Sequence, residues 1–183
     1  GWAGSAQNPS FGRDHEYRLR PPLSRKKVVI VGGGSGGMEY AITATQIGHE
    51  VVLFEKSGAL GGAMDWAGNY PNVPNMEIIR YQPDYHRAMM KKLNVHVGLN
   101  CAPGVKEILA ENPDVVVIAT GAEWIMPAFE GLEEAMASGF AVTMERAMSR
   151  DIPFDPGARP IVLGSAMGAG ADDLLVDRAI FNS

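Results

Sequence analysis

A run of glycines and one acidic residue are the parts of this chain whose types and spacing could do chemistry. The glycines follow a β-branched segment, and residues 28–40 read Val-Val-Ile-Val-Gly-Gly-Gly-Ser-Gly-Gly-Met-Glu-Tyr. Gly32 would permit a tight turn, Gly34 would let the backbone approach a diphosphate, and Gly37 would let a helix pack closely on a strand. A helix that begins here points unpaired N–H groups and the positive end of its dipole at a phosphate. The spacing therefore predicts a site for an adenine dinucleotide or ADP; the alternative is a glycine-rich turn without a ligand.

Glu55 is the expected acidic partner of this turn, because it closes the second apolar segment, residues 51–54. A carboxylate at this position accepts hydrogen bonds from a ribose. The alternative is a solvated charge after a strand. Lys56 is either a neighbour of the phosphate or the adenine, or a surface lysine. Ser35 and Gly36 complete the backbone that we expect at the diphosphate.

The hydrophobic pattern places the glycine turn in a β-α-β unit. Strands are expected at 27–31 and 50–54, with a helix at 36–47 between them and Gly48 as its C-terminal cap. The later elements are expected in this order: a long loop at 57–75, a helical segment at 76–93 that Pro83 kinks or divides, a short strand marked by Val95 and Val97, a helix at 105–110, and an apolar strand at 114–120 covered on both faces. This order predicts an α/β fold with a parallel sheet, right-handed crossovers and the ligand at the carboxyl ends of the strands.

Composition limits the kinds of partner. The chain has 183 residues, of which 46% are hydrophobic and 20% charged, as in ordinary globular proteins. Its net charge of −5 argues against a nucleic-acid partner, and no apolar run approaches the roughly 20 residues that span a bilayer. Cys101 is the single cysteine, which excludes an intrachain disulfide and favours a reducing cytoplasm. The histidines show no metal-ligand spacing, so no metal site is expected, and no arrangement of acid–base groups predicts a catalytic residue.

Further segments carry a resemblance to a known family. Leu60-Gly61-Gly62 follows Glu55-Lys56, residues 95–100 read Val-His-Val-Gly-Leu-Asn, and residues 114–122 read Asp-Val-Val-Val-Ile-Ala-Thr-Gly-Ala. With the glycine turn, these resemble the first half of the two-dinucleotide-fold flavoproteins. Within that group the chain is most similar to the C-terminal region of old-yellow-enzyme relatives typified by 2,4-dienoyl-CoA reductase and trimethylamine dehydrogenase. Residues 8–14 are similar to the segment that links the flavin barrel to this region.

The resemblance implies further cofactor contacts. Gly61 and Gly62 would let the main chain pass close to the pyrophosphate or the flavin; a plain loop turn is the alternative. Ala119, Thr120 and Gly121 would form a second backbone approach, because small residues at the carboxyl end of the central strand let a cofactor lie over it. The implied cofactor is FAD, with ADP as the alternative.

Two departures limit how much function the resemblance implies. Ser5 stands where the relatives have the last cysteine ligand of an iron–sulfur cluster, and a hydroxyl is a poor substitute for thiolate. No cluster is therefore expected on this chain by itself. Residues 159–163 look like the first strand of a second dinucleotide fold, with Gly164 kept, alanines at the later glycine positions and a helix expected from about 171. No second ribose-binding acid follows, so an NAD(P)H site is not expected.

The sequence thus predicts a Rossmann-like parallel sheet of the two-dinucleotide-binding flavoprotein type, with the second fold truncated. Three parts are expected: an extended arm at 1–24, an FAD/ADP-binding domain at 25–155, and an incomplete second Rossmann unit at 156–183. The predicted function is FAD binding in a subunit or fragment of an electron-transferring flavoprotein oxidoreductase, with a flavin-barrel or other oxidoreductase subunit as its partner. Two alternatives stay open: a structural ADP-binding module, and a non-catalytic interaction subunit with a vestigial site.

Overall fold

The computed structural model describes residues 11–68, 76–123, 126, 130–143 and 146–147, together with the backbone of two strands near the C-terminus. The elements, in chain order, are β1 Lys27–Val31, α1 Ser35–Gln46, β2 Glu50–Phe54, α2 Ala63–Ala67, the 3₁₀ helix η1 Met76–Arg80, α3 Tyr81–Lys92, β3 His96–Gly98, α4 Val105–Ala110, β4 Val115–Ile118, α5 Leu132–Ser138, β5 Val162–Ser165 and β6 Leu174–Asp177.

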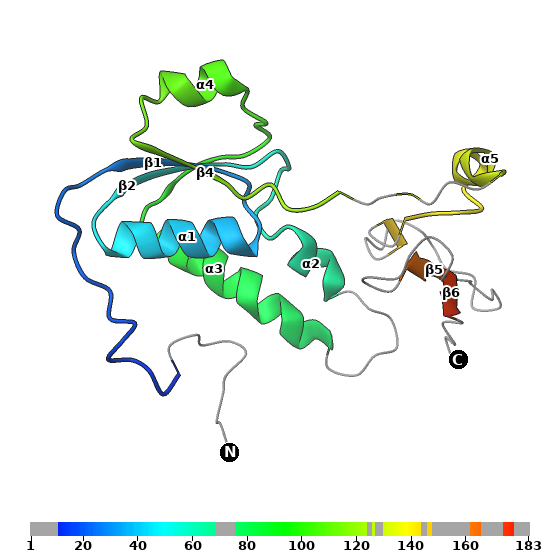
Figure 1. Ribbon diagram of the computed structural model, residues 1–183, viewed down its shortest axis with the longest axis horizontal. Coiled ribbons are helices and arrows are strands. Elements are labelled where there is room, and N and C mark those ends of the chain that lie inside the picture. Colours follow the sequence, from blue (N-terminus) through cyan, green and yellow to red (C-terminus); the bar gives the residue numbers. More distant parts are fainter. Residues whose placement is uncertain are drawn as a thin grey trace.

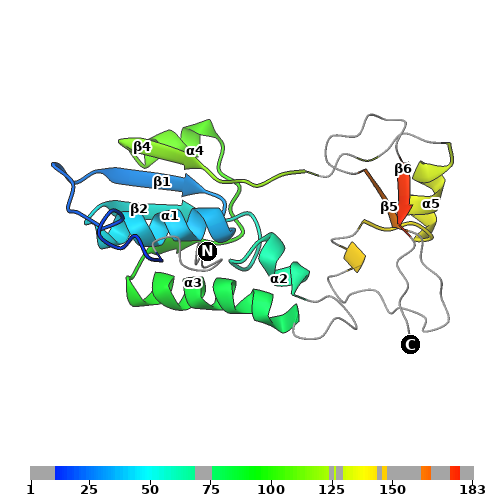
Figure 2. The same cartoon turned by 60° about the horizontal axis from the view of Figure 1, so that its bottom comes forward.

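A four-stranded sheet is the centre of the fold. Its strand order is β3-β2-β1-β4 and every neighbouring pair is parallel, with Val29 opposite Val52 on one side and Val116 on the other. Helices α1 and α3 cover one face, and α4 lies over the other (Figures 1 and 2). The predicted α/β fold with a parallel sheet is confirmed.

The main core lies between the sheet and α1. Ile30 and Leu53 are fully buried and face a stripe on α1 that includes Met38 and Ala41, while Met90 joins them from α3. Burying one such side chain stabilises the fold by about 1.5–3 kcal/mol. This packing holds the start of α1 rigidly against the end of β1.

Most elements up to residue 118 agree with the sequence prediction. Strands β1 and β2 and helix α4 have the predicted bounds. Helix α1 begins and ends one residue earlier than predicted; Ile47 is its C-cap, and the next residue, Gly48, takes a φ of +106°. Glycine adopts this left-handed region without the steric cost that a Cβ would bring.

The segment between β2 and β3 differs from the prediction in two ways. The expected loop contains α2, a helix of five residues that is too short to show a helical period in the sequence. The next helical segment divides between Arg80 and Tyr81 rather than at Pro83. Pro83 lies in the first turn of α3, where its missing N–H removes no helical hydrogen bond.

The prediction that the last strand of the sheet is covered on both faces was wrong. Val116 and Ile118 of β4 remain 40% and 68% exposed, whereas Val115 and Val117 pack toward the core. The reason is position: β4 forms one edge of the four-stranded sheet, and α4 does not cover the outer side chains of β4.

The C-terminal segment also departs from expectation. Strand β5 overlaps the predicted strand, but it pairs antiparallel with β6, which forms where a helix was expected. The antiparallel pairing gives backbone groups of both segments hydrogen-bond partners. The incomplete second Rossmann unit at 156–183 stays a prediction.

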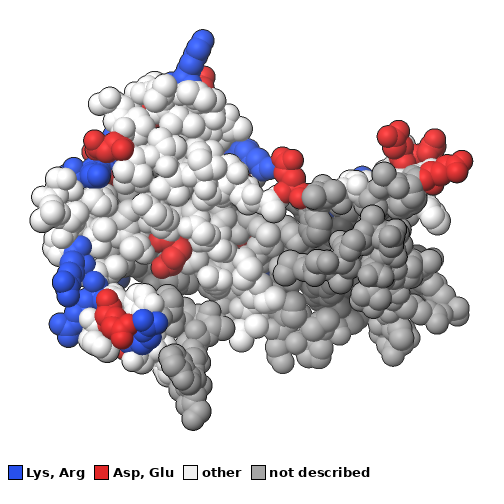
Figure 3. Space-filling view, viewed as in Figure 1, with Lys and Arg blue, Asp and Glu red and all other residues white. Residues whose placement is uncertain are grey.

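Charged side chains are unevenly placed on the surface. Basic groups gather along the N-terminal arm, acidic groups gather over α5, and much of the face between them is uncharged (Figure 3). None of the helices in the described ranges is long and apolar enough to cross a membrane. The three-part division of the chain stays a prediction.

Candidate nucleotide-binding site

The glycine turn connects β1 to α1 in the way the spacing predicts. Gly32 has a φ of +110°, and a Cβ on it would overlap the carbonyl oxygen of Ala119. A Cβ on Gly37 would overlap the carbonyl oxygen of Gly32. Only glycine at these two positions lets the turn close and α1 approach the sheet.

Gly34 leaves the start of α1 open. It precedes the helix in an extended conformation, and a Cβ on it would meet none of the described atoms within 4 Å; the same holds for Gly36. The N-cap residue, Gly34, provides no side-chain capping hydrogen bond to the first turn of α1. The Oγ atom of Ser35 is buried, and it has no hydrogen-bond partner in the part of the chain that the structure describes. Free N–H groups, open space and a hydroxyl without a partner fit a diphosphate at this position.

Glu55 lies directly beside the turn and is only 8% exposed. Its Oε2 accepts a hydrogen bond from the Gly33 N–H at 2.6 Å, and its Oε1 accepts two from the N–H and hydroxyl of Ser57, each at 2.8 Å. Oε2 therefore keeps a lone pair for a ribose hydroxyl.

Hydrogen bonding keeps the Glu55 carboxylate charged despite its burial. Burial alone would raise the pKa of this carboxyl. The hydrogen-bond donors on Ser57 and Gly33 and the positive charge of Lys56 lower the pKa by more than burial raises it, so the pKa lies below its ordinary value. Lys56 itself is exposed.

The Gly61-Gly62 segment forms a lip against the glycine turn. The Gly61 N–H donates to the carbonyl oxygen of Gly33 at 2.9 Å, and Gly61 pairs in parallel with Gly34. A Cβ on Gly62 would lie 3.0 Å from the Cα of Gly34. The structure therefore brings these glycines against the glycine turn, and in both cartoon views α2 lies beside the start of α1 (Figures 1 and 2).

The segment after β4 approaches the turn from the other side. Ala119 donates its N–H to the carbonyl oxygen of Val31 at 2.8 Å, and the backbone nitrogen of Thr120 lies 3.0 Å from where a Cβ on Gly32 would be. Thr120 and Gly121 are exposed, and Gly121 has a φ of +81°. The predicted residues thus gather at the carboxyl ends of β1, β2 and β4, and Lys56 among them is exposed.

Two residues of this region were missed from the sequence. Ser57 provides two of the three hydrogen bonds to Glu55. Arg87 of α3 donates a hydrogen bond to the carbonyl oxygen of Leu60, the residue just before the lip. Hydrogen bonds to Asp65 and then Asp84 raise the pKa of the Arg87 guanidinium against the opposing effect of burial. Only the bond between Asp84 and Arg87 had a signal in the sequence, because residues three apart lie on one face of a helix.

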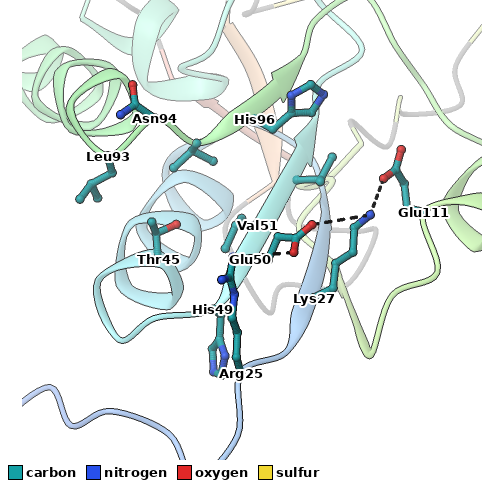
Figure 4. A pocket seen from close by; sticks show the side chains of 12 residues that line it. Arg25, Lys27, Thr45, His49, Glu50, Val51, Leu93, Asn94, His96 and Glu111 are labelled. Atoms are coloured by element: carbon teal, nitrogen blue, oxygen red, sulfur yellow. Dashed lines mark hydrogen bonds and ion pairs between the residues drawn. The ribbon is translucent and has the colours of Figure 1, made fainter.

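A separate hollow of about 500 Å³ lies at the opposite, amino-terminal edge of the sheet. It is lined by Arg25, Lys27, Thr45, His49, Glu50, Val51, Val52, Leu93, Asn94, Val95, His96 and Glu111 (Figure 4). Lys27 Nζ lies 2.9 Å from a Glu111 oxygen and 3.9 Å from a Glu50 oxygen, and the bond to Glu111 raises the Lys27 pKa. The positive charge of Lys27 is already paired with the carboxylates of Glu111 and Glu50. Parallel sheets bind ligands at the carboxyl ends of their strands, so the glycine turn is the better site for a nucleotide.

Together these features define a dinucleotide-binding domain of the Rossmann type: a parallel sheet, a glycine turn at the start of the first helix, and an acid after the second strand. The chain belongs to the pyridine nucleotide-disulphide oxidoreductase family, whose profile matches residues 4–69 and 26–167. The matching domain is an FAD-binding domain, and related flavoproteins are among the proteins it resembles, which confirms the predicted resemblance and cofactor.

Individual relatives support this assignment. The bilirubin reductase of Mediterraneibacter gnavus is 42% identical over 125 residues, which cover 68% of this chain and 19% of the relative. The NADH oxidase of Thermoanaerobacter brockii is 32% identical over 161 residues, which cover 87% of this chain and 24% of the relative. The solved 2-naphthoyl-CoA reductase has a TM-score of 0.61 and 34% identity over 74% of this chain and 21% of that one. The chain therefore spans about a fifth to a quarter of the length of these proteins.

Proposed function

We propose that this chain holds FAD at the glycine turn, as the adenine-dinucleotide-binding part of a flavoprotein oxidoreductase. The observation that carries the proposal is the open start of α1 beside the buried, anionic Glu55. A diphosphate fits the first group and a ribose fits the second. The FAD-binding family to which the chain belongs supports the same cofactor.

Each group has a separate task in this proposal. The N–H groups at the start of α1 and the Ser35 hydroxyl donate to the diphosphate, and Gly34 leaves room for it. Glu55 accepts from the ribose through Oε2. The backbone of Gly61 and Gly62 forms one wall, and Ala119 with the residues that follow it forms another. A bound flavin supplies the redox chemistry, and these residues bind and orient the cofactor.

The finer proposal is that the whole protein is an electron-transferring reductase like the dienoyl-CoA reductases. The similarity to a bilirubin reductase and to a 2-naphthoyl-CoA reductase supports this class. In this proposal the substrate meets a second flavin in a barrel provided by another subunit or another part of the protein. A cytoplasmic setting is part of the same proposal, and the single cysteine supports it.

A structural ADP site is the second candidate, and one observation favours it. Strands β5 and β6 pair antiparallel, whereas the strands of a Rossmann unit pair in parallel, so this described pair gives no support for a nicotinamide site. A structural nucleotide at the glycine turn needs no such site.

The purified chain distinguishes these functions directly. Its visible spectrum is recorded, and the supernatant is then analysed chromatographically for nucleotides after denaturation. A flavin spectrum with released FAD is the expected result. Released ADP without flavin would support the structural module instead. A chain that carries no nucleotide and binds none of the added FAD or ADP would refute both functions and leave an interaction subunit.

A further inference from the structure

Arg87 of α3 connects the helix layer to the lip of the nucleotide site. Its Nη1 donates to the carbonyl oxygen of Leu60 at 2.6 Å and to Asp65 Oδ2 at 2.8 Å. Its Nη2 donates to Asp65 Oδ1 at 3.1 Å and to Asp84 Oδ1 at 2.6 Å. One guanidinium thus bonds a backbone carbonyl, a carboxylate on α2 and a carboxylate on its own helix.

These bonds converge on Gly61. A Cβ on Gly61 would overlap the carboxylate of Asp65 and would lie 2.8 Å from Arg87 Nη1, so the ion pair packs directly against this glycine. Leu60, the residue whose carbonyl accepts from Arg87, immediately precedes it. On its other side, Gly61 donates its N–H to Gly33 and pairs with Gly34. The lip is therefore held between the guanidinium and the glycine turn.

This arrangement differs from an ordinary surface ion pair. Exposed pairs of long side chains contribute little, because water competes for both groups and each side chain loses conformational freedom. The Arg87 and Asp65 side chains are 31% and 33% exposed, and the guanidinium also bonds a main-chain carbonyl. The planar guanidinium of arginine has several N–H donors and can bond a backbone carbonyl and a carboxylate at the same time, whereas the ammonium of lysine is a point charge.

We propose that Arg87 is a positioning residue for the nucleotide site: through Leu60 and Asp65 it holds the Gly61-Gly62 lip against the glycine turn and so forms the wall of the diphosphate pocket. This inference rests on the proposed function, because it concerns the same site. Arg87 does not touch the nucleotide itself. Loss of the guanidinium releases the lip and weakens the part of binding that depends on the diphosphate.

The test compares three variants of the full chain. Arg87→Met removes every donor and keeps much of the side-chain length, and Asp65→Asn weakens the same contact from α2. Asp84→Asn is the matched control, because Asp84 also bonds Arg87 but is 61% exposed and lies on α3, away from the lip. Dissociation constants for ADP and AMP are measured by calorimetry, and each nucleotide-free variant is checked by thermal unfolding.

The ratio of the two affinities separates positioning from a general loss of stability. We expect Arg87→Met to weaken ADP binding about tenfold, which corresponds to about 1.4 kcal/mol, and to weaken AMP binding much less. Asp65→Asn changes the ratio in the same direction, while Asp84→Asn leaves it unchanged. Should Arg87→Met fail to fold, Asp65→Asn carries the comparison.

Other results would overturn the inference. If the Arg87 and Asp65 variants keep the ADP-to-AMP preference of the unmodified chain, the lip does not depend on Arg87. An equal loss for both nucleotides would show a structural role only. If the unmodified chain binds neither ADP nor FAD, the proposed function itself is wrong, and the proposed role of Arg87 is then wrong as well.

Discussion

Replacing Gly34 by valine separates the nucleotide from the fold more cleanly than any other single change. Gly34 has φ and ψ of −74° and −177°, an extended conformation that a β-branched residue adopts readily. A Cβ built there meets no described atom within 4 Å. A Cβ at this position therefore meets no steric conflict with the described residues, whereas a diphosphate at the start of α1 would occupy the same space.

The structure sets the size and sign of both effects. Replacing glycine where its φ and ψ suit other residues stabilises a protein by about 0.4–1 kcal/mol, because the unfolded chain loses freedom. Gly34 is also the N-cap residue of α1, a position where valine is less favourable than glycine, so this second effect opposes the first. The unfolding midpoint of the nucleotide-free Gly34→Val variant should therefore change little. Two methyl groups in the diphosphate space should weaken ADP or FAD binding by on the order of 100-fold, about 2.7 kcal/mol.

The assay measures nucleotide affinity by calorimetry and unfolding by denaturant on the same samples. Gly37→Ala is the contrasting variant: its Cβ would overlap the carbonyl oxygen of Gly32 in the protein itself, so it should destabilise the nucleotide-free chain. Unchanged affinity in Gly34→Val would refute the assignment of the diphosphate to this turn. A large loss of stability in the nucleotide-free variant would show that glycine is needed there for folding.

Two further predictions concern Glu55. Glu55→Gln should weaken nucleotide binding by roughly 1–3 kcal/mol, because a ribose hydroxyl loses a charged acceptor; calorimetry with ADP checks this, and equal affinity would mean that the acid points elsewhere. The lowered pKa of Glu55 also predicts a pH dependence of folding. Because the folded-state pKa lies below the ordinary value of 4.5, the carboxylate stabilises the fold above that pH, and the contribution is lost as the pH falls through the folded-state value. Denaturant unfolding between neutral and acidic pH should show this loss in the unmodified chain and less of it in Glu55→Gln; identical profiles would contradict it.

Much of the fold was readable because its signals are local. Strands β1 and β2 are apolar runs rich in valine, and glycine marks both ends of α1, so pattern alone predicts the bounds of both strands and places α1 within one residue. Burial of the outer side chains of β4 could not be read, because it depends on whether a strand is central or at an edge. The pairing of β5 with β6 depends on which partner strand is nearest in space.

The site divides in the same way. The motif spacing predicted Gly34 and Glu55, and the structure places both at the carboxyl edge of the sheet. Ser57 and Arg87 carry no motif. Ser57 bonds Glu55 because the chain turns back after β2, and Arg87 bonds Leu60 because α3 packs beside α2.

The sequence by itself determined the glycine turn, the acid that faces it and the parallel β-α-β unit, since each follows from the conformations that a short stretch of chain can adopt. Only the tertiary structure decided how the carboxylate stays charged while buried and what holds the second glycine pair in place. The first depends on the bend that brings Ser57 back to Glu55 and on the N–H of Gly33, 22 residues away; the second depends on the bonds from Arg87 to Leu60 and Asp65. The bonds from Gly33 and Arg87 exist only once the strands and helices have packed together.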